Sequence, residues 1–137
     1  MIQYRVGNQL DLEQVIELYR ASTLGERRPI DEPERFAGML SNANLVITAW
    51  EGDLPVGISR SFTDFNFITY LADLAVRVSH QKQGIGKELI RLTRFHGGPK
   101  TTLLLLAAPA AEKYYSHIGF DHAPNAWLLK PGVTITD

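Results

Sequence analysis

Residues 70–96 read YLADLAVRVSHQKQGIGKELIRLTRFH, and this stretch decides the fold. Its apolar beginning predicts a strand over Tyr70–Val78, and its later spacing predicts a helix after Gly84. The joint between them carries Gln81, Gly84 and Gly86 in the pattern Q-x-x-G-x-G. N–H groups at a helix start lack intrahelical acceptors and lie at the positive end of the helix dipole, and glycines let an anion approach them. The pattern therefore predicts a pyrophosphate-binding loop.

Two common nucleotide-binding motifs do not match this loop. A dinucleotide fingerprint would need a third glycine near position 89, where this chain has leucine. A Walker loop would need Gly-Lys-Ser/Thr, but Gly86 and Lys87 are followed by Glu88. The remaining alternative without a ligand is a helix start that uses two glycines for a tight turn.

Length and composition bound the possible functions. A chain of 137 residues predicts one domain, 1–137, and 45% hydrophobic with 21% charged residues argues against disorder. Fourteen Lys and Arg against 15 Asp and Glu give a net charge of −1, which predicts no nucleic-acid or anionic-membrane partner. Cysteine is absent, so no thiol nucleophile, disulfide or thiolate metal site is expected. With no apolar signal-peptide core and a longest apolar run of 103–108, we expect a cytoplasmic protein.

The periodicity of the rest of the chain predicts the element order β-α-α-β-β-β-α-β-α-β. Residues 101–108, TTLLLLAA, indicate a strand buried on both faces and joined to the strand over 70–78 by a parallel crossover. The other predicted elements are a strand over 2–6, a helix over 12–21 capped by Asp11, an irregular loop over 22–33, a helix from Pro33, a hairpin of 45–50 and 54–65, a short helix over 109–117 capped by Gly119, and a last strand within 126–132.

A second motif lies at residues 111–120, AEKYYSHIGF. Together with Q-x-x-G-x-G after a strand, this A-x-x-x-Y-x-x-x-G-F ending resembles the GNAT superfamily of acetyl-CoA-dependent N-acetyltransferases. The resemblance covers nearly the whole chain. It implies an α+β fold, a mixed antiparallel and parallel sheet with helices on both faces. It also implies acetyl-CoA as co-substrate, an amine acceptor, direct attack in a ternary complex without a metal, and allows a homodimer.

The resemblance assigns the catalytic role to Tyr115, aligned on Gly119 and Phe120. Tyr115 would be the general acid that protonates the departing CoA thiolate, since a phenol pKa near ~10 keeps the donor form present at neutral pH. Adjacent helical positions point about 100° apart, so Tyr114 is interpreted as a core residue. The alternative is that both tyrosines only pack.

The resemblance also assigns the coenzyme contacts. Backbone groups of Leu74 and Val76 would pair with the pantetheine arm, and the Val76 N–H would polarise the thioester carbonyl. The pyrophosphate would lie in the segment Gln81, Lys82, Gln83, Gly84, Ile85, Gly86 and Lys87. Lys82 and Lys87 would add charge, or would be ordinary solvated lysines.

The general base is the part of the family pattern that this chain lacks. The positions where many members carry glutamate are Tyr70 and Ala72, and the asparagine frequent after the fifth strand is replaced by Ala108. Strand alternation places 70, 72, 74 and 76 on one face and Asp73 on the other, so Asp73 is interpreted as structural, unless a bulge reverses the parity. The candidates are Glu26, Asp64, Asp73, His117 and water. The four histidines share no metal-ligand spacing.

The acceptor side rests on the family's acceptor loops, here 22–30 and 64–69. Glu26, Arg27 and Arg28 could bind a charged acceptor, or could form a solvated loop. The small size favours a compact acceptor, a small amine or an exposed protein N-terminus. Two rival functions stay open: a non-catalytic acyl-CoA-binding module, and a nucleotide-binding protein.

Overall fold

The computed structural model describes residues 1–136. The chain divides into two compact units, Met1–Leu105 and Leu106–Asp137, and each is described by itself. In the described residues, no helix has both the length and the apolar character needed to cross a membrane.

The first unit is built on a five-stranded sheet in which the strand order follows the chain, β1-β2-β3-β4-β5. Neighbouring strands are antiparallel except β4 and β5, which are parallel. This confirms the predicted mixed sheet and the parallel crossover. The strands are β1 (Ile2–Val6), β2 (Leu45–Glu51), β3 (Leu54–Thr63), β4 (Ile68–Val76) and β5 (Thr102–Leu105).

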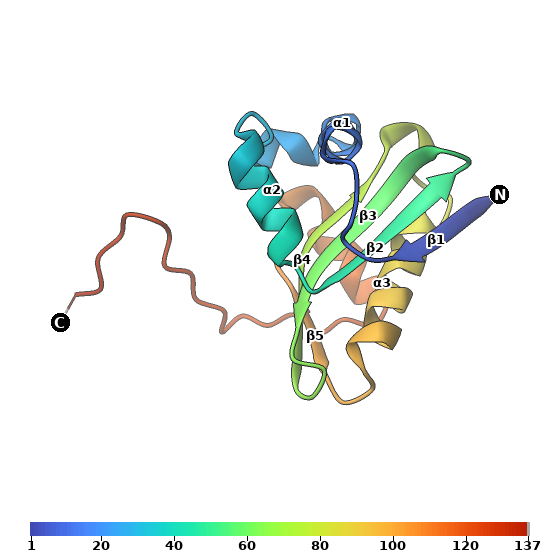
Figure 1. The fold of residues 1–137 in the computed structure, drawn as a ribbon. Coiled ribbons are helices and arrows are strands. Elements are labelled where there is room, and N and C mark those ends of the chain that lie inside the picture. Colours follow the sequence, from blue (N-terminus) through green and yellow to red (C-terminus); the bar gives the residue numbers. More distant parts are fainter. Residues whose placement is uncertain (137) are drawn as a thin grey trace. The chain divides into compact units, whose positions relative to one another are not determined.

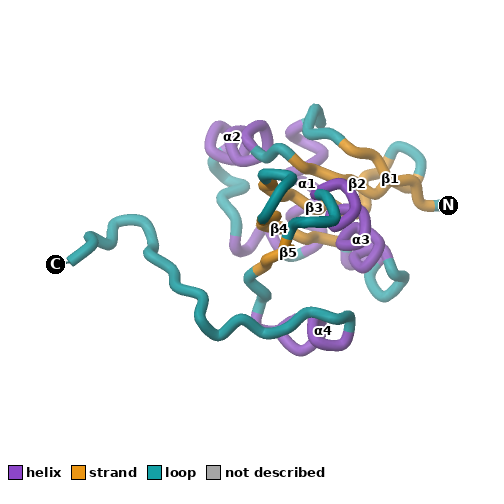
Figure 2. The backbone as a smooth tube through the Cα atoms, turned by 90° about the horizontal axis from the view of Figure 1, so that it is seen from below, coloured by secondary structure: helices purple, strands orange, loops and turns teal. Residues whose placement is uncertain are grey.

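Helices cover both faces of this sheet, as the fold class requires (Figures 1 and 2). Helices α1 (Leu12–Ser22) and α2 (Pro33–Asn42) pack on one face, and α3 (Ile85–Gly97) packs on the other. The predicted cap of α1 is present, because the Gln14 N–H donates to Asp11 Oδ2 at 3.0 Å. Pro33 occupies the first turn of α2, where its missing N–H costs nothing.

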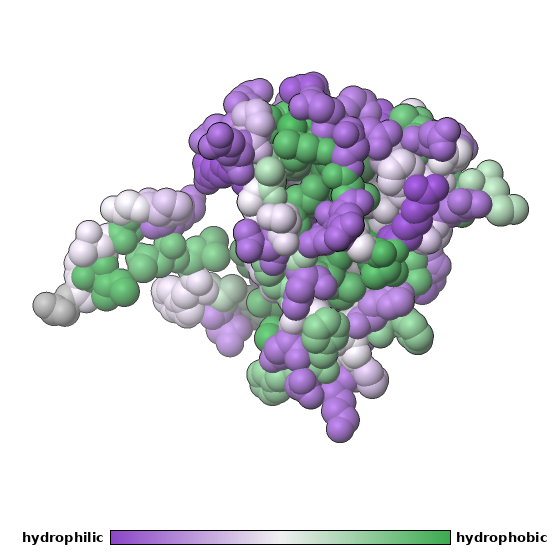
Figure 3. All heavy atoms as spheres, in the orientation of Figure 1, coloured by the Kyte–Doolittle hydropathy of each residue, from purple (hydrophilic) through white to green (hydrophobic). Residues whose placement is uncertain are grey.

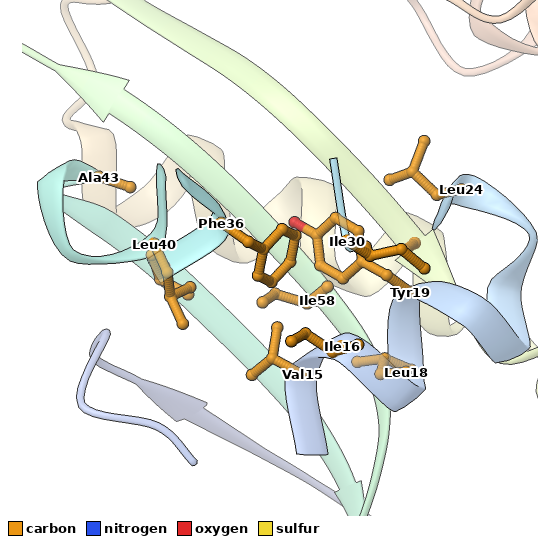
Figure 4. Packing of buried hydrophobic residues seen from close by; sticks show 12 residues of the cluster. Val15, Ile16, Leu18, Tyr19, Leu24, Ile30, Phe36, Leu40, Ala43 and Ile58 are labelled. Carbon is orange, nitrogen blue, oxygen red and sulfur yellow. The ribbon is translucent and has the colours of Figure 1, made fainter. Parts of the chain in front are cut away.

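Two apolar clusters form the core, one on each face of the sheet. Figure 4 shows the cluster under α1 and α2. In this cluster the rings of Tyr19 and Phe36 pack edge to face, with 4.8 Å between the ring centroids. The other cluster packs α3 through Ile85 and Leu89 onto strands β2 and β3. Strand β2 is buried on both faces because Val46 belongs to the first cluster and Ile47 to the second.

Several predicted features of the first unit were wrong, among them the end of β3, which lies at Thr63 instead of 65. Strand β4 spans Ile68–Val76 instead of 70–78: Ile68 and Thr69 already pair with β5, and Val78–His80 form a 3-10 turn (η2). The loop predicted as irregular contains the 3-10 turn η1, Leu24–Arg27. Strand β5 spans only Thr102–Leu105, and its residues alternate between exposed and half-buried instead of being buried on both faces. The ends of the strands depend on pairing partners that a local pattern does not contain.

The second unit holds a short 3-10 turn η3 (Pro109–Ala111) and helix α4 (Glu112–His117). Gly119 ends the helix as predicted: its φ is 107°, and the Phe120 N–H donates to the Tyr115 carbonyl at 3.0 Å. The predicted strand within 126–132 was wrong, since the described residues after 120 contain no strand. Apolar side chains there, with Trp127 92% exposed, are not packed into a core, and hydrophobic residues recur along this segment in Figure 3.

Candidate functional site

A bulge in β4 is the feature from which the site is built. Arg60 of β3 pairs with Asp73 and the next residue, Ser61, pairs with Leu71, so Ala72 is an extra residue without a partner. Thr69 lies against Gly97 of α3, whereas Asp73 lies against Tyr19 of α1. Two odd-numbered residues of one strand thus lie on opposite faces of the sheet.

The bulge corrects the predicted parity of this strand. Tyr70 does not share a face with Leu74 and Val76, because the extra residue lies between them. Leu74 and Val76 pack toward α3, and Asp73 faces the other side, as predicted. The bulge therefore reverses only the part of the strand that precedes Ala72.

Strand β4 has a free edge beyond the bulge. Its pairing with β5 ends at Leu71 and Leu105, although β4 continues to Val76. The Arg77 N–H donates to the Val56 carbonyl at 2.8 Å. Because ladder bonds alternate along an antiparallel pair, the backbone groups of Leu74 and Val76 point away from β3, toward this edge. We call these backbone groups of Leu74 and Val76 the β4 edge.

The start of α3 lies beside the end of β4. The Gln81 side chain donates to the Val76 carbonyl at 3.0 Å. A Cβ on Gly86 would contact only Val76 Cγ2, at 3.6 Å, so Gly86 also adjoins that residue. The predicted pyrophosphate loop and the β4 edge are therefore neighbours in one continuous strand–turn–helix segment.

The geometry of this turn leaves N–H groups free. Lys82 and Gly84 have φ angles of 64° and 84°, in the left-handed region that favours glycine. The first helical hydrogen bond runs from the Glu88 N–H to the Gly84 carbonyl at 3.0 Å, and no side chain caps the helix. The N–H groups of Ile85, Gly86 and Lys87 precede that bond and are available to a ligand. We call these three N–H groups the α3 cradle.

Side chains in the segment differ in what they could contribute to a ligand. The Ile85 side chain is buried in the core, so only its backbone is accessible. Gln83, Lys82 and Lys87 are exposed, and within residues 1–136 neither lysine forms an ion pair. Both ammonium groups are therefore available to an anion bound at the α3 cradle.

Asp73 is held by three donors, one from α1, one from β3 and one from the loop after η1. Its Oδ1 accepts from Arg28 Nε at 2.6 Å, and its Oδ2 accepts from Arg60 Nε at 2.6 Å and from the Tyr19 hydroxyl at 2.7 Å. Burial alone would raise the pKa of Asp73, but Arg60, Tyr19 and Arg28 together hold that pKa below its usual value. Asp73 is thus a structural anion and a poor proton acceptor, which agrees with its structural interpretation.

Among the other candidate bases, Asp64 is also held by hydrogen bonds, whereas Glu26 and His117 are exposed. Asp64 Oδ1 accepts backbone N–H bonds from Phe67 at 2.7 Å, Asn66 at 2.9 Å and Ile68 at 3.0 Å. These bonds lower the pKa of Asp64, and the bond from Phe67 has the largest effect. The carboxylate therefore closes the loop and is a weak base. Glu26 on η1 and His117 on α4 are exposed. They and water remain as candidate bases.

In the second unit, Tyr115 is half-buried on α4. Its ring packs edge to face on the rings of Phe120 and Tyr114, with centroid distances of 5.5 Å and 5.4 Å. Burial, followed by the neighbouring Tyr114, raises the pKa of the Tyr115 phenol. Its proton is therefore present throughout the neutral range. The interpretation of Tyr114 as a core residue was wrong, since that side chain is 42% exposed.

Sequence reasoning missed the partners of Asp73. Arg60 lies among buried residues of β3, and Asp73 is the only charged residue of β4. Opposite charges in two buried strands indicate a pair, because an unpaired buried charge is unstable. Arg28 had no comparable signal, because its loop is polar. In the described residues, no group of three or more His, Asp or Glu side chains could hold a metal ion.

Comparison with known protein families finds one matching model, described as an acetyltransferase (GNAT) domain, over residues 22–137. No curated protein matches the chain. Among solved structures, a GNAT-family acetyltransferase from Streptococcus pneumoniae TIGR4 is 26% identical, with a TM-score of 0.70, covering 95% of this chain and 99% of its own.

Two further structures share the fold at lower identity. A crystal structure described as a putative acetyltransferase from Deinococcus radiodurans R1 has a TM-score of 0.77 at 20% identity, covering 95% of this chain and 88% of its own. An aminoglycoside N-acetyltransferase in complex with CoA has a TM-score of 0.72 at 15% identity, covering 96% of this chain and 95% of its own.

Proposed function

This chain belongs to the GNAT acetyltransferase family, and on that premise we propose that it transfers the acetyl group of acetyl-CoA to a primary amine. The acceptor would be a small molecule or an exposed peptide or protein N-terminus. The observation that carries the proposal is the adjacency of the β4 edge and the α3 cradle. One offers backbone groups to an extended amide-containing arm, and the other offers N–H groups to a pyrophosphate.

The proposed backbone contacts use groups that point away from the β3–β4 ladder or precede the first hydrogen bond of α3. The N–H and carbonyl of Leu74 would pair with the pantetheine arm, and the Val76 N–H would donate to the thioester carbonyl oxygen. The residues from Gln81 to Lys87 would surround the pyrophosphate, through the α3 cradle and the charges of Lys82 and Lys87. The burial of the Ile85 side chain limits that residue to a backbone contact.

The reaction would be a direct displacement. The amine nitrogen attacks the thioester carbon, and the carbonyl oxygen that gains negative charge is stabilised by the Val76 N–H. Collapse of this tetrahedral species breaks the C–S bond and releases the CoA thiolate. Tyr115 is proposed, from the A-x-x-x-Y-x-x-x-G-F motif, to give that sulfur its proton. The proton lost by the amine passes to water, Glu26 or His117, and the products are an amide and free CoA.

The α3 cradle can be tested with Gly86→Asp. A Cβ there has room, and an acidic residue at the second helical position favours the helix dipole by roughly 0.3–1 kcal/mol, so stability should be unchanged or slightly higher. The new carboxylate would repel the pyrophosphate, and CoA binding measured by calorimetry should weaken at least about tenfold.

Gly38→Asp is the matched control for this variant. It introduces the same side chain into α2, where a Cβ meets no atom within 4 Å. Unchanged CoA affinity in Gly86→Asp, with both variants folded, would place the coenzyme elsewhere.

The proposed function is tested by measuring CoA-thiol release from acetyl-CoA with a panel of amines: polyamines, amino acids, aminoglycosides, and peptides with free N-termini or lysines. Release with one class establishes the enzyme and its acceptor. Release with none, while acetyl-CoA binds, favours the rival function of an acyl-CoA-binding module. Absence of acetyl-CoA binding contradicts the proposal altogether.

A further inference from the structure

Arg28 connects the loop after α1 to the bulge of β4. Its Nε donates to Asp73 Oδ1 at 2.6 Å, and its Nη2 donates to the Ala72 carbonyl at 3.2 Å. A third donor, Nη1, bonds the carbonyl of Arg27 in its own loop at 2.8 Å. From these contacts we infer that Arg28 is a positioning residue for acetyl-CoA: it holds the bulge that turns the β4 edge outward. This inference rests on the proposed function.

The bulge needs a donor from outside the sheet. An extra residue in a strand leaves backbone groups outside the ladder, and a buried carbonyl without a donor is destabilising. Ala72 is that extra residue, and the guanidinium of Arg28 supplies the donor for its carbonyl. Arg28 thereby satisfies a backbone group that the bulge leaves outside the ladder.

The bulge decides which way the β4 edge faces. Pairing of β4 with β5 stops at Leu71, the residue immediately before Ala72. If the strand absorbed its extra residue into a regular ladder, the register against β3 would shift by one. The N–H groups of Leu74 and Val76 would then point at β3, and Ala75 would face the edge instead. An Arg28 contact on the α1 side of the sheet thus sets the direction of backbone groups proposed to bind the coenzyme.

Loss of Arg28 should leave the fold intact. Asp73 would keep two of its donors, Arg60 and the Tyr19 hydroxyl, both on the face of the sheet that α1 and α2 cover. The Arg28 side chain is 27% exposed, so water can take its place at the Asp73 carboxylate. Its effect on coenzyme binding can therefore be measured separately from stability.

The test compares Arg28→Gln and Arg28→Lys with Arg27→Gln, a control that removes the same charge from the adjacent exposed arginine. The readouts are CoA affinity by calorimetry, kcat and KM, and the thermal midpoint. We expect Arg28→Gln to weaken CoA binding roughly tenfold, since it loses charge-assisted hydrogen bonds to the bulge. The loss should fall on the KM for acetyl-CoA, with Arg28→Lys in between, whereas Arg27→Gln should leave CoA affinity and the KM for acetyl-CoA unchanged.

Amide hydrogen exchange gives a readout that needs no coenzyme. In the unchanged protein the N–H groups of Leu74 and Val76 should exchange faster than that of Ala75, and in Arg28→Gln this contrast should shrink, because the strand samples the shifted register more often. If the wild type binds CoA while Arg28→Gln matches Arg27→Gln in CoA affinity and in amide hydrogen exchange, the inference about Arg28 is overturned and the proposed function stands. If the wild type does not bind CoA, the proposed function falls and takes the coenzyme role of Arg28 with it.

Discussion

Asp73→Ala is expected to lower the free energy of unfolding by about 3–5 kcal/mol, the cost of breaking a buried ion pair by removing one partner. The variant leaves Arg60 buried without its counter-charge and the Tyr19 hydroxyl without an acceptor. Arg28 contributes less to this cost because its side chain reaches water. Urea denaturation followed by circular dichroism measures the change. Asp53→Ala, at an exposed turn residue, is the control, and equal midpoints for the two variants would contradict the result.

The same carboxylate should give the protein an acid-sensitive stability. Because the folded-state pKa of Asp73 is held below its unfolded value, its stabilisation is complete above about pH 4 and is lost as the pH falls through the folded pKa. Asp73→Asn cannot titrate, so its stability should depend less on pH below about 4. Parallel pH curves for Asp73→Asn and the wild type would show that another group is responsible.

Tyr115→Phe is expected to lower kcat by about 10²–10⁴-fold while acetyl-CoA binding is retained. The substitution removes only the phenol oxygen, and the ring can keep its contact with Phe120. Steady-state kinetics with the best amine of the panel, combined with calorimetry, separates the two effects. Tyr114→Phe changes an exposed neighbour in the same way and should leave turnover unchanged.

The pH profile provides an independent check on the role of Tyr115. Its pKa is raised, so the donor form persists above the usual range of tyrosine and activity should not fall on that account until the pH exceeds about 10. If Tyr115→Phe turns over at the wild-type rate, the leaving thiolate takes its proton from another donor. If the wild type has no turnover with any amine but binds acetyl-CoA, the binding-module function is favoured.

Local patterns in the sequence predicted most elements of the first unit. The 3.6-residue spacing and capping of α1, and the glycines that bound α3, are properties of single segments. The mixed sheet also followed, because a strand, helix and strand in succession have one favoured connection. The end of β4 and the short length of β5 could not be predicted, because each depends on how far a neighbouring strand accompanies it.

The same distinction between contiguous motifs and contacts made by folding applies to the candidate site. The α3 cradle could be predicted because its chemistry belongs to a contiguous run with Gly84 and Gly86. The bulge at Ala72 could not, since an alternating apolar pattern gives no sign of one extra residue. Arg28 meets Asp73 only through the folded path of a polar loop, a contact between residues 45 positions apart. The failure of the predicted strand within 126–132 shows that apolar content alone does not make a strand.

The order of strands in the sheet also has a consequence for how the chain assembles during synthesis. Strands β2, β3 and β4 pair as consecutive hairpins, whose closure needs only short loops, whereas β5 can join only after α3 has been made. A nascent chain that has emerged as far as Val76 already contains Tyr19, Arg28, Arg60 and Asp73, but not yet the helix start at Gly84. The contacts of Asp73 with Tyr19, Arg28 and Arg60 can therefore form before the α3 cradle exists, and a coenzyme that uses this cradle would bind only after α3 has been made.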